Sequence, residues 1–536
     1  MTRETCGCCE CGDIGRNETS RTGVASATEG AAGRSGHVPD ATARPSDLNP
    51  VPHYFRNALL IFSAGVAGAA PPSPVRFATY NVSFFRATEG ALLAELNATP
   101  ASVTSNPANI HQVAEALQRI RPDVLLLNEF DDDGGQSMNL FADKFLATPQ
   151  RPGLQGLSLP VRYAARSNTG VSTGFDLDNN GSAVTTPGTE AYGNDCFGFG
   201  TFPGQYGLVV YSRFPIELSK IRTFQLFKWK DLPGSQLRLN SGIPPLTTYY
   251  SAGEQEVLRL SSKTHLDVPV DLGGGIIAHL LASHPTPPTF DGAENKNGKR
   301  NYDEIRFWSD YIDPARSAYL LDDAGGRGGL PAGARFVVEG DQNADPNDGD
   351  TLTGAARQLT QHPLINASFI PSSGATGGGA NFSTANNGQT GNRIHDTAAF
   401  SGGLRVDYVL PSKAGFSVFN GVVFWPGPSD PLRTVIGDTD PSDHHMVWMD
   451  LRPQISLGEA VVDFEAVWTG HAVTLTWQAA AGYQYKVQQS TSLAAGTWAD
   501  TGIVPDITPD TREASAVIPA SAAGRAFYRL EVSFAP

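Results

Sequence analysis

Hydrophobic residues recur along this chain with two different spacings from Val75 onward. Residues 109–120 carry apolar side chains at helical spacing, and Asp303–Ile312 repeats the pattern, so both segments are predicted to be amphipathic helices. Short apolar runs between turn-forming residues predict buried strands. The expected strands are Val75–Val82, Val124–Leu127, Gly207–Ser212, Ile276–Ser283, Arg335–Glu339, Arg405–Leu410 and Met446–Asp450. This alternation predicts a mixed α and β domain.

The pattern changes near Ile455. Val473–Trp477, Tyr485–Gln489 and Tyr528–Val532 alternate apolar and polar residues, and turn-forming segments separate them. This pattern is typical of a small antiparallel β-sandwich, and it resembles the fibronectin-like modules found at the C-terminus of many secreted bacterial proteins. We therefore expect one domain over residues 71–455 and a β-sandwich module over residues 456–536.

Residues 53–70 have the pattern of a secretory signal peptide. Arg56 precedes a short apolar run that ends in small residues, among them Ala67 and Ala69. The run is too short to span a membrane, for which about 20 apolar residues are needed. We expect residues 1–70 to be untranslated or cleaved, and the mature protein to be secreted without integral membrane association. The alternative is a short buried helix.

Composition and charge narrow the function classes. The chain has 536 residues, of which 17% are charged, and its 57 glycines and 38 prolines favour a strand- and loop-rich protein. The net charge of −15 disfavours a protein that clamps nucleic acid through basic side chains, although a bound cation can reverse the sign locally. Four of the five cysteines crowd into residues 6–11, and Cys196 stands alone. A zinc site at the head would need a second cluster that does not follow.

Polar side chains stand at or near the ends of most predicted strands. Carboxylate, amide and imidazole groups hold hard metal ions and phosphate groups in proteins. Because strand ends that converge on one edge of a fold often build its site, we expect these residues to meet. They are Asn81, Glu129, His284, Asp341, Asn343, Asp407, Asp443 and His444.

No single residue of this set is informative alone. An asparagine after a strand, such as Asn81, is more often a turn residue than a ligand. A carboxylate inside a strand, such as Asp407, is costly to bury unless another side chain pairs with it. The serial order of the set is therefore the stronger signal.

That order, Asn, Glu, His, Asp-x-Asn, Asp and Asp-His, resembles the endonuclease/exonuclease/phosphatase superfamily of metal-dependent phosphoesterases. Its most diagnostic pieces here are Gly340-Asp341-Gln342-Asn343 and Ser442-Asp443-His444. The other matching pieces are Thr79-Tyr80-Asn81-Val82, Leu127-Asn128-Glu129-Phe130, Tyr211-Ser212-Arg213-Phe214-Pro215, Ser283-His284-Pro285 and Arg405-Val406-Asp407-Tyr408. Together they span residues 75–452. The Gly-x-Ser-x-Gly, His-Glu-x-x-His and Walker motifs of rival hydrolases are absent from the sequence.

The resemblance implies an α+β fold, a four-layered α/β/β/α sandwich with the site along one edge. Two packed, mostly antiparallel sheets would carry helices on their outer faces, and the small all-β sandwich domain would follow. Gly156–Gly204 and Gly374–Ala399 are expected to be loops at that edge, where they would set substrate choice.

The resemblance also implies a metal site. Asn81, Glu129 and Asp443 would hold Mg²⁺, with Mn²⁺ or Ca²⁺ as alternatives, through oxygen ligands. Asp341 would orient or deprotonate the attacking water.

The remaining residues are expected to face the phosphoryl group. Asn343 would donate a hydrogen bond to a phosphoryl oxygen, and His284 and His444 would contact the same group. Asp407 would orient His444, which supplies the partner that a buried Asp407 needs. No side chain need act as nucleophile, so the resemblance implies in-line attack by water.

We therefore expect a secreted, monomeric hydrolase of phosphate esters, a phosphodiesterase or phosphatase that scavenges phosphate. A secreted nuclease is the alternative within the same class of enzyme, disfavoured by the acidic charge. An inactive adhesion or binding protein is the alternative outside it, and the intact set of site residues argues against this.

Four further groups of residues allow two interpretations each. Asp176, Asp178 and Asn180 fit the start of a Ca²⁺ loop or an ordinary turn, because the glutamate expected at the twelfth position is missing. Asp345, Asp348 and Asp350 allow the same two interpretations. Asp131, Asp132 and Asp133 would bind a second cation or solvate a loop. Three basic residues would contact substrate or serve the fold; they are Arg259, Lys263 and His265.

Overall fold

The computed structural model describes residues 73–103, 108–238, 248–273, 276–382, 388–454, 461–468, 471–479, 483–492, 497–508, 512–519 and 527–534. The segment 53–70, the cysteines of residues 6–11 and the expected domain boundary at residue 455 lie outside these ranges. No helix in the described part of the chain combines the length and apolar character that crossing a bilayer requires.

Two sheets form the centre of residues 73–454. Their strands are β1 (Val75–Phe84), β2 (Val124–Phe130), β3 (Val161–Ala165), β4 (Gly207–Ser212), β5 (Arg222–Thr223), β6 (His265–Asp271), β7 (Ile277–Ser283), β8 (Phe336–Asp341), β9 (Asp407–Pro411), β10 (Phe416–Val423) and β11 (Val447–Pro453). The six-stranded sheet has the order β10-β11-β1-β2-β4-β3, and the five-stranded sheet has the order β5-β6-β7-β8-β9. Only the neighbours β1/β2 and β7/β8 run parallel within these described sheets.

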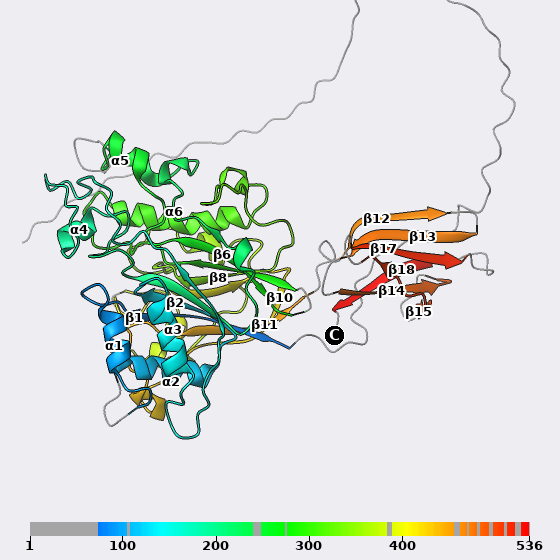
Figure 1. Cartoon of the computed structure of the whole chain (residues 1–536), viewed down its shortest axis with the longest axis horizontal. Coiled ribbons are helices and arrows are strands. Elements are labelled where there is room, and N and C mark those ends of the chain that lie inside the picture. The colour runs from blue at the N-terminus through cyan, green and yellow to red at the C-terminus, as the bar shows by residue number, and fades with distance from the viewer. Residues whose placement is uncertain are drawn as a thin grey trace, which may run out of the picture. The chain divides into compact units, whose positions relative to one another are not determined.

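Helices cover the outer faces of both sheets (Figure 1). The described helices are α1 (Ala91–Ala98), α2 (Asn109–Ile120), α3 (Gln136–Leu140), α4 (Glu190–Asn194), α5 (Ala252–Val257), α6 (Lys296–Tyr311), α7 (Arg357–Thr360) and α8 (Gly378–Asn381). A π-helical turn spans Phe141–Leu146, and 3₁₀ helices span Leu218–Lys220, Trp229–Asp231, Gln236–Arg238, Ser317–Tyr319, Arg393–His395 and Pro431–Thr434. Helices α1 and α2 pack on the six-stranded sheet, and α6 packs on the five-stranded sheet. This arrangement is the expected four-layered α/β/β/α sandwich.

Helix α2 illustrates how the sequence pattern builds a layer. Val113 and Leu117 are fully buried against the first sheet, and the chain leaves the helix at Arg121 with a positive φ of 55° before Pro122. Burying one such side chain contributes about 1.5–3 kcal/mol. Leu117→Ala would cost about 2–5 kcal/mol, because the surrounding layer cannot fully close the cavity.

The strand register aligns the polar strand ends at one edge. In the parallel pair β1/β2, Asn81 lies opposite Asn128, which precedes Glu129. In the antiparallel pair β8/β9, Asp341 lies opposite Asp407. The core between the sheets is apolar below this edge. Register therefore places the polar residues together.

Two segments that were predicted to be loops contain regular secondary structure. Gly156–Gly204 contains strand β3 and helix α4, and Gly374–Ala399 contains helix α8 and a 3₁₀ helix, so neither segment is loop throughout. The residues of β3 belong to the first sheet as its edge strand. An edge strand needs only one pairing partner, so its apolar signal is weak.

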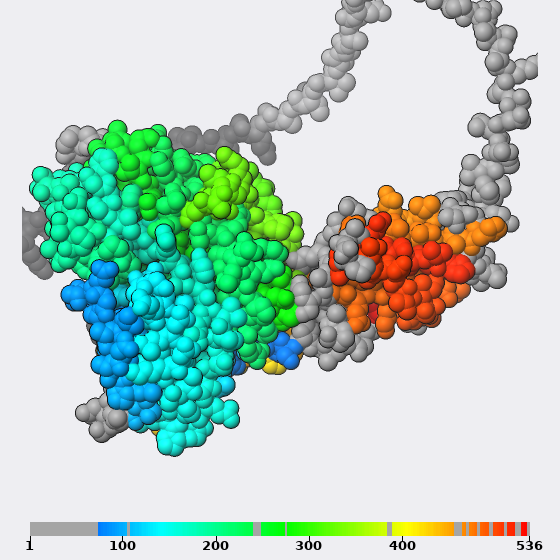
Figure 2. All heavy atoms as spheres, viewed as in Figure 1, coloured from blue at the N-terminus to red at the C-terminus, as the bar shows by residue number. Residues whose placement is uncertain are grey.

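The C-terminal residues form two small antiparallel sheets (orange to red in Figure 2). Their strands are β12 (Val461–Trp468), β13 (Ala472–Ala479), β14 (Tyr483–Ser490), β15 (Ala499–Asp500), β16 (Asp506–Ile507), β17 (Glu513–Pro519) and β18 (Phe527–Phe534). The sheet orders are β12-β13-β17-β16 and β15-β14-β18. Trp477 and Leu475 from one sheet share a core with Val487 and Val532 from the other. The predicted all-β module is confirmed.

Candidate functional site

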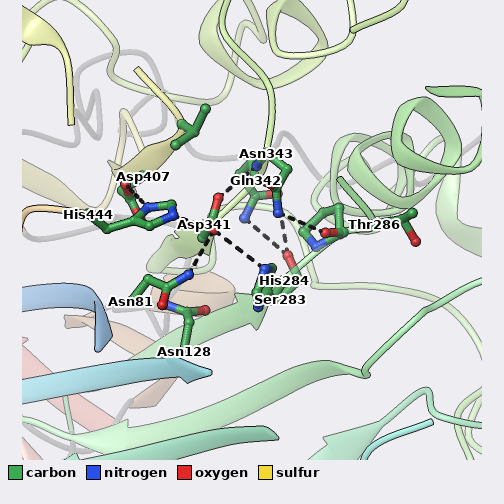
Figure 3. Close-up of polar contacts among 12 residues, drawn as sticks. Asn81, Asn128, Ser283, His284, Thr286, Asp341, Gln342, Asn343, Asp407 and His444 are labelled. Carbon is green, nitrogen blue, oxygen red and sulfur yellow. Dashed lines mark hydrogen bonds and ion pairs between the residues drawn. The ribbon is translucent and has the colours of Figure 1, made fainter. Parts of the chain in front are cut away.

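Asp341 ends strand β8 and lies at the centre of the polar edge (Figure 3). Its Oδ2 accepts a hydrogen bond of 3.1 Å from the Asn81 side chain and lies 3.4 Å from Nε2 of His284 and 3.6 Å from Nε2 of His444. Gly340 precedes it with a φ of 133°, and a Cβ there would lie 2.0 Å from the Ser283 carbonyl oxygen. Only glycine therefore allows β8 to approach β7 closely enough to build this cluster.

His444 is paired with Asp407, as the sequence predicted. Nδ1 of His444 donates to Oδ2 of Asp407 at 2.9 Å, and both side chains are buried. The backbone amide of Asp407 donates to the Thr397 hydroxyl at 3.0 Å, which anchors the pair. Burial lowers the pKa of His444, but attraction by Asp407 and Asp341 outweighs it and raises the pKa well above its ordinary value. His444 is therefore an imidazolium at neutral pH.

His284 lies on the other side of Asp341 and is neutral. Burial, reinforced by repulsion from Lys263 and His444, lowers the pKa of His284 well below its ordinary value. Its Nδ1 is buried and finds no hydrogen-bond partner in the described part of the chain. The two histidines thus offer different chemistry, one a charged donor and one a neutral ring.

The ionisation of Asp341 is balanced between opposing neighbours. Burial raises the pKa of Asp341 to about 7, with His444 lowering it and Asp407 raising it. The Asn343 backbone amide also donates to Oδ1 of Asp341 at 2.9 Å. A carboxyl group with this pKa can accept or release a proton near neutral pH, as a general base must.

Glu129 reaches the site through a distortion of strand β2. It has a positive φ of 59°, at the point where the register with β4 shifts between Asn128 and Phe130. A bulge of this kind re-aims a side chain out of the regular alternation of a strand. Burial raises the pKa of Glu129, attraction by His444 and a hydrogen bond from Asn81 lower it, and repulsion by Asp443 raises it.

The oxygen atoms on this side of the site fit a hard divalent cation. Glu129 and Asp443 are half-buried carboxylates that repel one another, and the Asp443 side chain makes no hydrogen bond or ion pair with any described residue. The Asn81 Oδ1 accepts only a 3.3 Å hydrogen bond from the Ser83 amide among the described residues. Carboxylate and amide oxygens with free lone pairs are what Mg²⁺ or Ca²⁺ requires.

A second set of potential ligands is less suitable. Asp341, Asp407 and His444 bring ligand atoms within 4.8 Å of one another. However, Nδ1 of His444 donates to Asp407 and is not free to bind a metal. The carboxylates of Glu129 and Asp443 suit a cation better than this set does.

The structure brings all eight predicted residues to one edge, although Asn343 differs in detail. Its side-chain amide donates to the Pro285 carbonyl at 3.1 Å rather than standing free. It remains half-buried, with a φ of 50°. The expected hydrogen bond from Asn343 to a phosphoryl oxygen would need the second amide hydrogen and stays a prediction.

Sequence reasoning missed the polar face of helix α6, whose side chains hold the loops that border the site. Glu304 accepts hydrogen bonds from the backbone amides of Ser262 (2.5 Å) and Thr286 (2.6 Å). Asn301 donates to the carbonyls of Thr286 and Gln342, both at 2.9 Å. A signal was present in the sequence. Asn301 and Glu304 have helical spacing with Trp308 and therefore share a face with it. A large apolar residue such as Trp308 is not expected on a helix face that is exposed to solvent.

The acidic clusters have structural partners in the described chain. Asp131 accepts hydrogen bonds from the Arg86 and Tyr206 amides, and Asp345 accepts from the Asn347 and Arg405 amides. These bonds favour the interpretation that both clusters shape loops.

The expected calcium loop is closed by hydrogen bonds. Asp176, Asp178 and Asp195 offer carboxylate oxygens within 4.8 Å of one another, and Asp195 was not foreseen. The Asn180 backbone amide donates to Asp176 and Asp178, and its side-chain oxygen accepts a hydrogen bond from the Ser182 amide. An ordinary turn accounts for this geometry.

The three basic residues have different roles in the structure. His265 is buried against helix α6, with Nε2 2.9 Å from the Glu304 carbonyl, and Arg259 donates to Asn168 at 2.6 Å. Both serve the fold. Lys263 instead lines a pocket together with Glu129.

A comparison with protein-family models identifies one family. The sequence model of the Endonuclease/Exonuclease/phosphatase family matches residues 78–444. A search of curated proteins finds no match. Among solved structures, an endonuclease/exonuclease/phosphatase from Beutenbergia cavernae is similar at 15% identity and a TM-score of 0.40, over 87% of this chain and 93% of that one.

Two further solved structures resemble the chain. A family protein from Bacteroides vulgatus is 12% identical, with a TM-score of 0.34, over 72% of this chain and 100% of that one. TDP2 from Caenorhabditis elegans is 12% identical, with a TM-score of 0.32, over 70% and 75% of the two chains. At these identities and TM-scores the structural likenesses carry no argument about the site.

Proposed function

This chain belongs to the Endonuclease/Exonuclease/phosphatase family, and from that premise we propose that it hydrolyses small phosphate esters by in-line attack of water. Family membership makes it a metal-dependent phosphoesterase in class. The proposal adds that the mature enzyme is exported, on the pattern of residues 53–70, and that diesters or monoesters rather than nucleic acid are its substrates. The net charge of −15 supports the second point.

One observation carries the proposal. A buried carboxyl group with a pKa near neutrality, Asp341, lies between an imidazolium and a neutral imidazole, with the carboxylates of Glu129 and Asp443 on the same edge. This arrangement supplies a proton acceptor for water and a fixed positive charge for a phosphoryl oxygen.

The residues divide the work. A divalent cation held by Asn81, Glu129 and Asp443 would polarise the phosphoryl group when bound. Asp341 takes the proton of the attacking water. His444, held by Asp407, donates a charged hydrogen bond to a non-bridging phosphoryl oxygen, where negative charge develops.

Hydrolysis of bis-p-nitrophenyl phosphate, p-nitrophenyl phosphate, plasmid DNA and phospholipid, with and without EDTA, tests the proposal. We expect metal-dependent turnover of the small esters, abolished by EDTA and restored by Mg²⁺, Mn²⁺ or Ca²⁺. Glu129→Gln should lower kcat/KM by about 10²-fold or more. Glu217→Gln, which changes a glutamate paired with Lys220 at the surface, is the matched control.

Three outcomes would count against parts of the proposal. EDTA-resistant turnover would overturn the metal mechanism. Preference for plasmid DNA over small esters would favour the nuclease alternative. Lack of any hydrolysis by well-folded protein with added metal would favour an inactive binding protein.

A further inference from the structure

A pocket of about 700 Å³ opens beside Glu129. Lys263, Thr286, Tyr206, Tyr250 and Phe290 also line it. Asp341, His284 and His444 are not part of its wall. The pocket therefore opens beside the metal-binding side of the site. Its volume suits a small organic group.

Three basic residues line this pocket, and two of them already make hydrogen bonds within the protein. Arg300 donates to the backbone carbonyls of Leu260, Phe197 and Arg259. Lys296 donates to the Tyr249 hydroxyl at 2.9 Å and lies over that ring. These hydrogen bonds hold the pocket wall together and fix both side chains against it.

Lys263 is different. Its side chain is only 6% exposed, yet Nζ makes no hydrogen bond or ion pair with any residue that the structure describes. The carboxylates of Glu304, Glu129 and Asp341 attract it, but none forms an ion pair with it, so its N–H donors are free for an anion that arrives from outside. Attraction by Glu304, Glu129 and Asp341 only partly offsets the effect of burial, which lowers the pKa of Lys263.

The backbone fixes where this ammonium lies. Glu304 accepts the amide hydrogen of Ser262 on one side, and the Lys263 carbonyl accepts a 2.9 Å hydrogen bond from the Asn168 amide. The same Glu304 carboxylate holds Thr286, two residues beyond His284 on the loop after β7 (Figure 3). One buried carboxylate on helix α6 therefore couples the position of Lys263 to that of the site.

In-line displacement places the attacking water and the leaving group on opposite sides of phosphorus. With water at Asp341, the leaving group departs from the opposite side of phosphorus, and the pocket beside Glu129 offers space for it. We propose, resting on the phosphoesterase function above, that this pocket receives the leaving group of the ester and that the Lys263 ammonium stabilises the negative charge on the departing oxygen.

The step balances as follows. The water oxygen forms a bond to phosphorus and gives its proton to the Asp341 carboxylate. The bond from phosphorus to the leaving oxygen breaks, and its electron pair stays on that oxygen. The resulting oxyanion is hydrogen-bonded by the Lys263 ammonium and takes a proton from solvent as it leaves the pocket.

The test is a series of methyl phosphate diesters with p-nitrophenol, p-chlorophenol and phenol as leaving groups, in increasing order of pKa. A better leaving group needs less stabilisation, so the loss in Lys263→Met should grow along the series. We expect kcat/KM to fall by less than about 10-fold for the p-nitrophenyl ester and by about 10²-fold or more for the phenyl ester. Lys263→Arg keeps the positive charge and should recover part of the loss.

Two comparisons keep the result interpretable. Lys220→Met removes a charge from an exposed lysine outside the pocket and should leave all three esters unchanged relative to wild type. Circular dichroism and thermal melts of Lys263→Met and Lys263→Arg separate a folding defect from a catalytic one. If Lys263→Met does not fold, the role of Lys263 is judged from Lys263→Arg, by how its loss in kcat/KM changes along the leaving-group series.

An equal loss for all three esters, or a rise in KM with kcat unchanged, would overturn the role of Lys263 at the leaving oxygen. Either result would leave metal-dependent hydrolysis by the wild type intact. Failure of the wild type to hydrolyse any ester with added metal would instead refute the proposed function, so the two failures are distinguishable.

Discussion

Asp407 is expected to act through His444, and removing either should cost the same catalytic contribution. The two side chains are buried and 2.9 Å apart, and Asp407 is the strongest attraction that keeps the imidazole protonated. At an effective dielectric constant of about 20, such a pair interacts by roughly 4 kcal/mol or more. Asp407→Asn removes this attraction, so burial returns the pKa of His444 toward or below its ordinary value.

The magnitude follows from the loss of one charged donor to the phosphoryl group. Asp407→Asn and His444→Ala should each lower kcat/KM by about 10²–10³-fold, or roughly 2.7–4 kcal/mol. Independent residues would give about 10⁴–10⁶-fold in the double variant. A single unit should leave the double variant close to His444→Ala alone.

The assay measures kcat/KM on bis-p-nitrophenyl phosphate for all four proteins at saturating metal, between about pH 6 and about pH 8. Lower pH reprotonates a His444 that has lost Asp407, so the ratio of Asp407→Asn to wild type should rise as pH falls. The ratio for His444→Ala should show no such recovery. Additive losses, or a flat ratio for Asp407→Asn, would refute the coupling.

Four other predictions address stability and domain roles. Glu339→Gln should flatten the pH dependence of the unfolding free energy, because burial raises the pKa of Glu339 well above its ordinary value. Wild-type stability is then complete below the unfolded pKa and falls by up to about 1.4 kcal/mol per pH unit as pH rises toward the folded pKa, as denaturant melts will measure. Glu304→Gln replaces one accepting oxygen with a donor facing an amide, and should lower the unfolding free energy by about 2 kcal/mol in the same melts. Removing residues 456–536 should leave kcat on a small ester unchanged, since all eight site residues precede them. N-terminal sequencing of exported protein should find Pro71 at or near the first position; a chain that retains residues 6–11 would contradict the signal-peptide interpretation.

The strands and helices that could be predicted are those that are buried on both faces or whose apolar residues recur with a regular period. Helix α2 was predicted with its observed bounds because its apolar residues recur every three or four positions and Pro122 ends it. Strand β3 was missed because four of its five residues are only half-buried and alternate weakly. Helix α6 was predicted too short, because its first turns carry polar residues such as Arg300 and Asn301 that are buried by tertiary contacts.

The candidate site divides in the same way. Residues at strand ends, such as Asp341 and Asp407, were predicted because the order of the motifs is local information. The positions of Glu304 and Lys263 beside the site were not predicted. Glu304 accepts hydrogen bonds from two loops that are distant in the sequence, and such contacts depend on how the layers of the fold pack on one another. Sequence periodicity reports which face of an element is buried, and cannot report which backbone amide that face meets.

The local charge balance explains how an acidic protein can favour an anionic substrate. Four carboxylates, those of Glu129, Asp341, Asp407 and Asp443, stand at the site against two positive groups, the His444 imidazolium and the Lys263 ammonium. Without a cation this edge repels phosphate, and burial, together with repulsion from neighbouring carboxylates, raises the pKa values of two of its carboxyl groups. A divalent ion at Glu129 and Asp443 would reverse that sign over a few ångströms, where the net charge of the whole chain has little influence. Under the proposed function, substrate selection at this site would be governed by the ion and the two positive side chains beside it, and the overall charge of −15 would bear mainly on extended polyanions that reach beyond them.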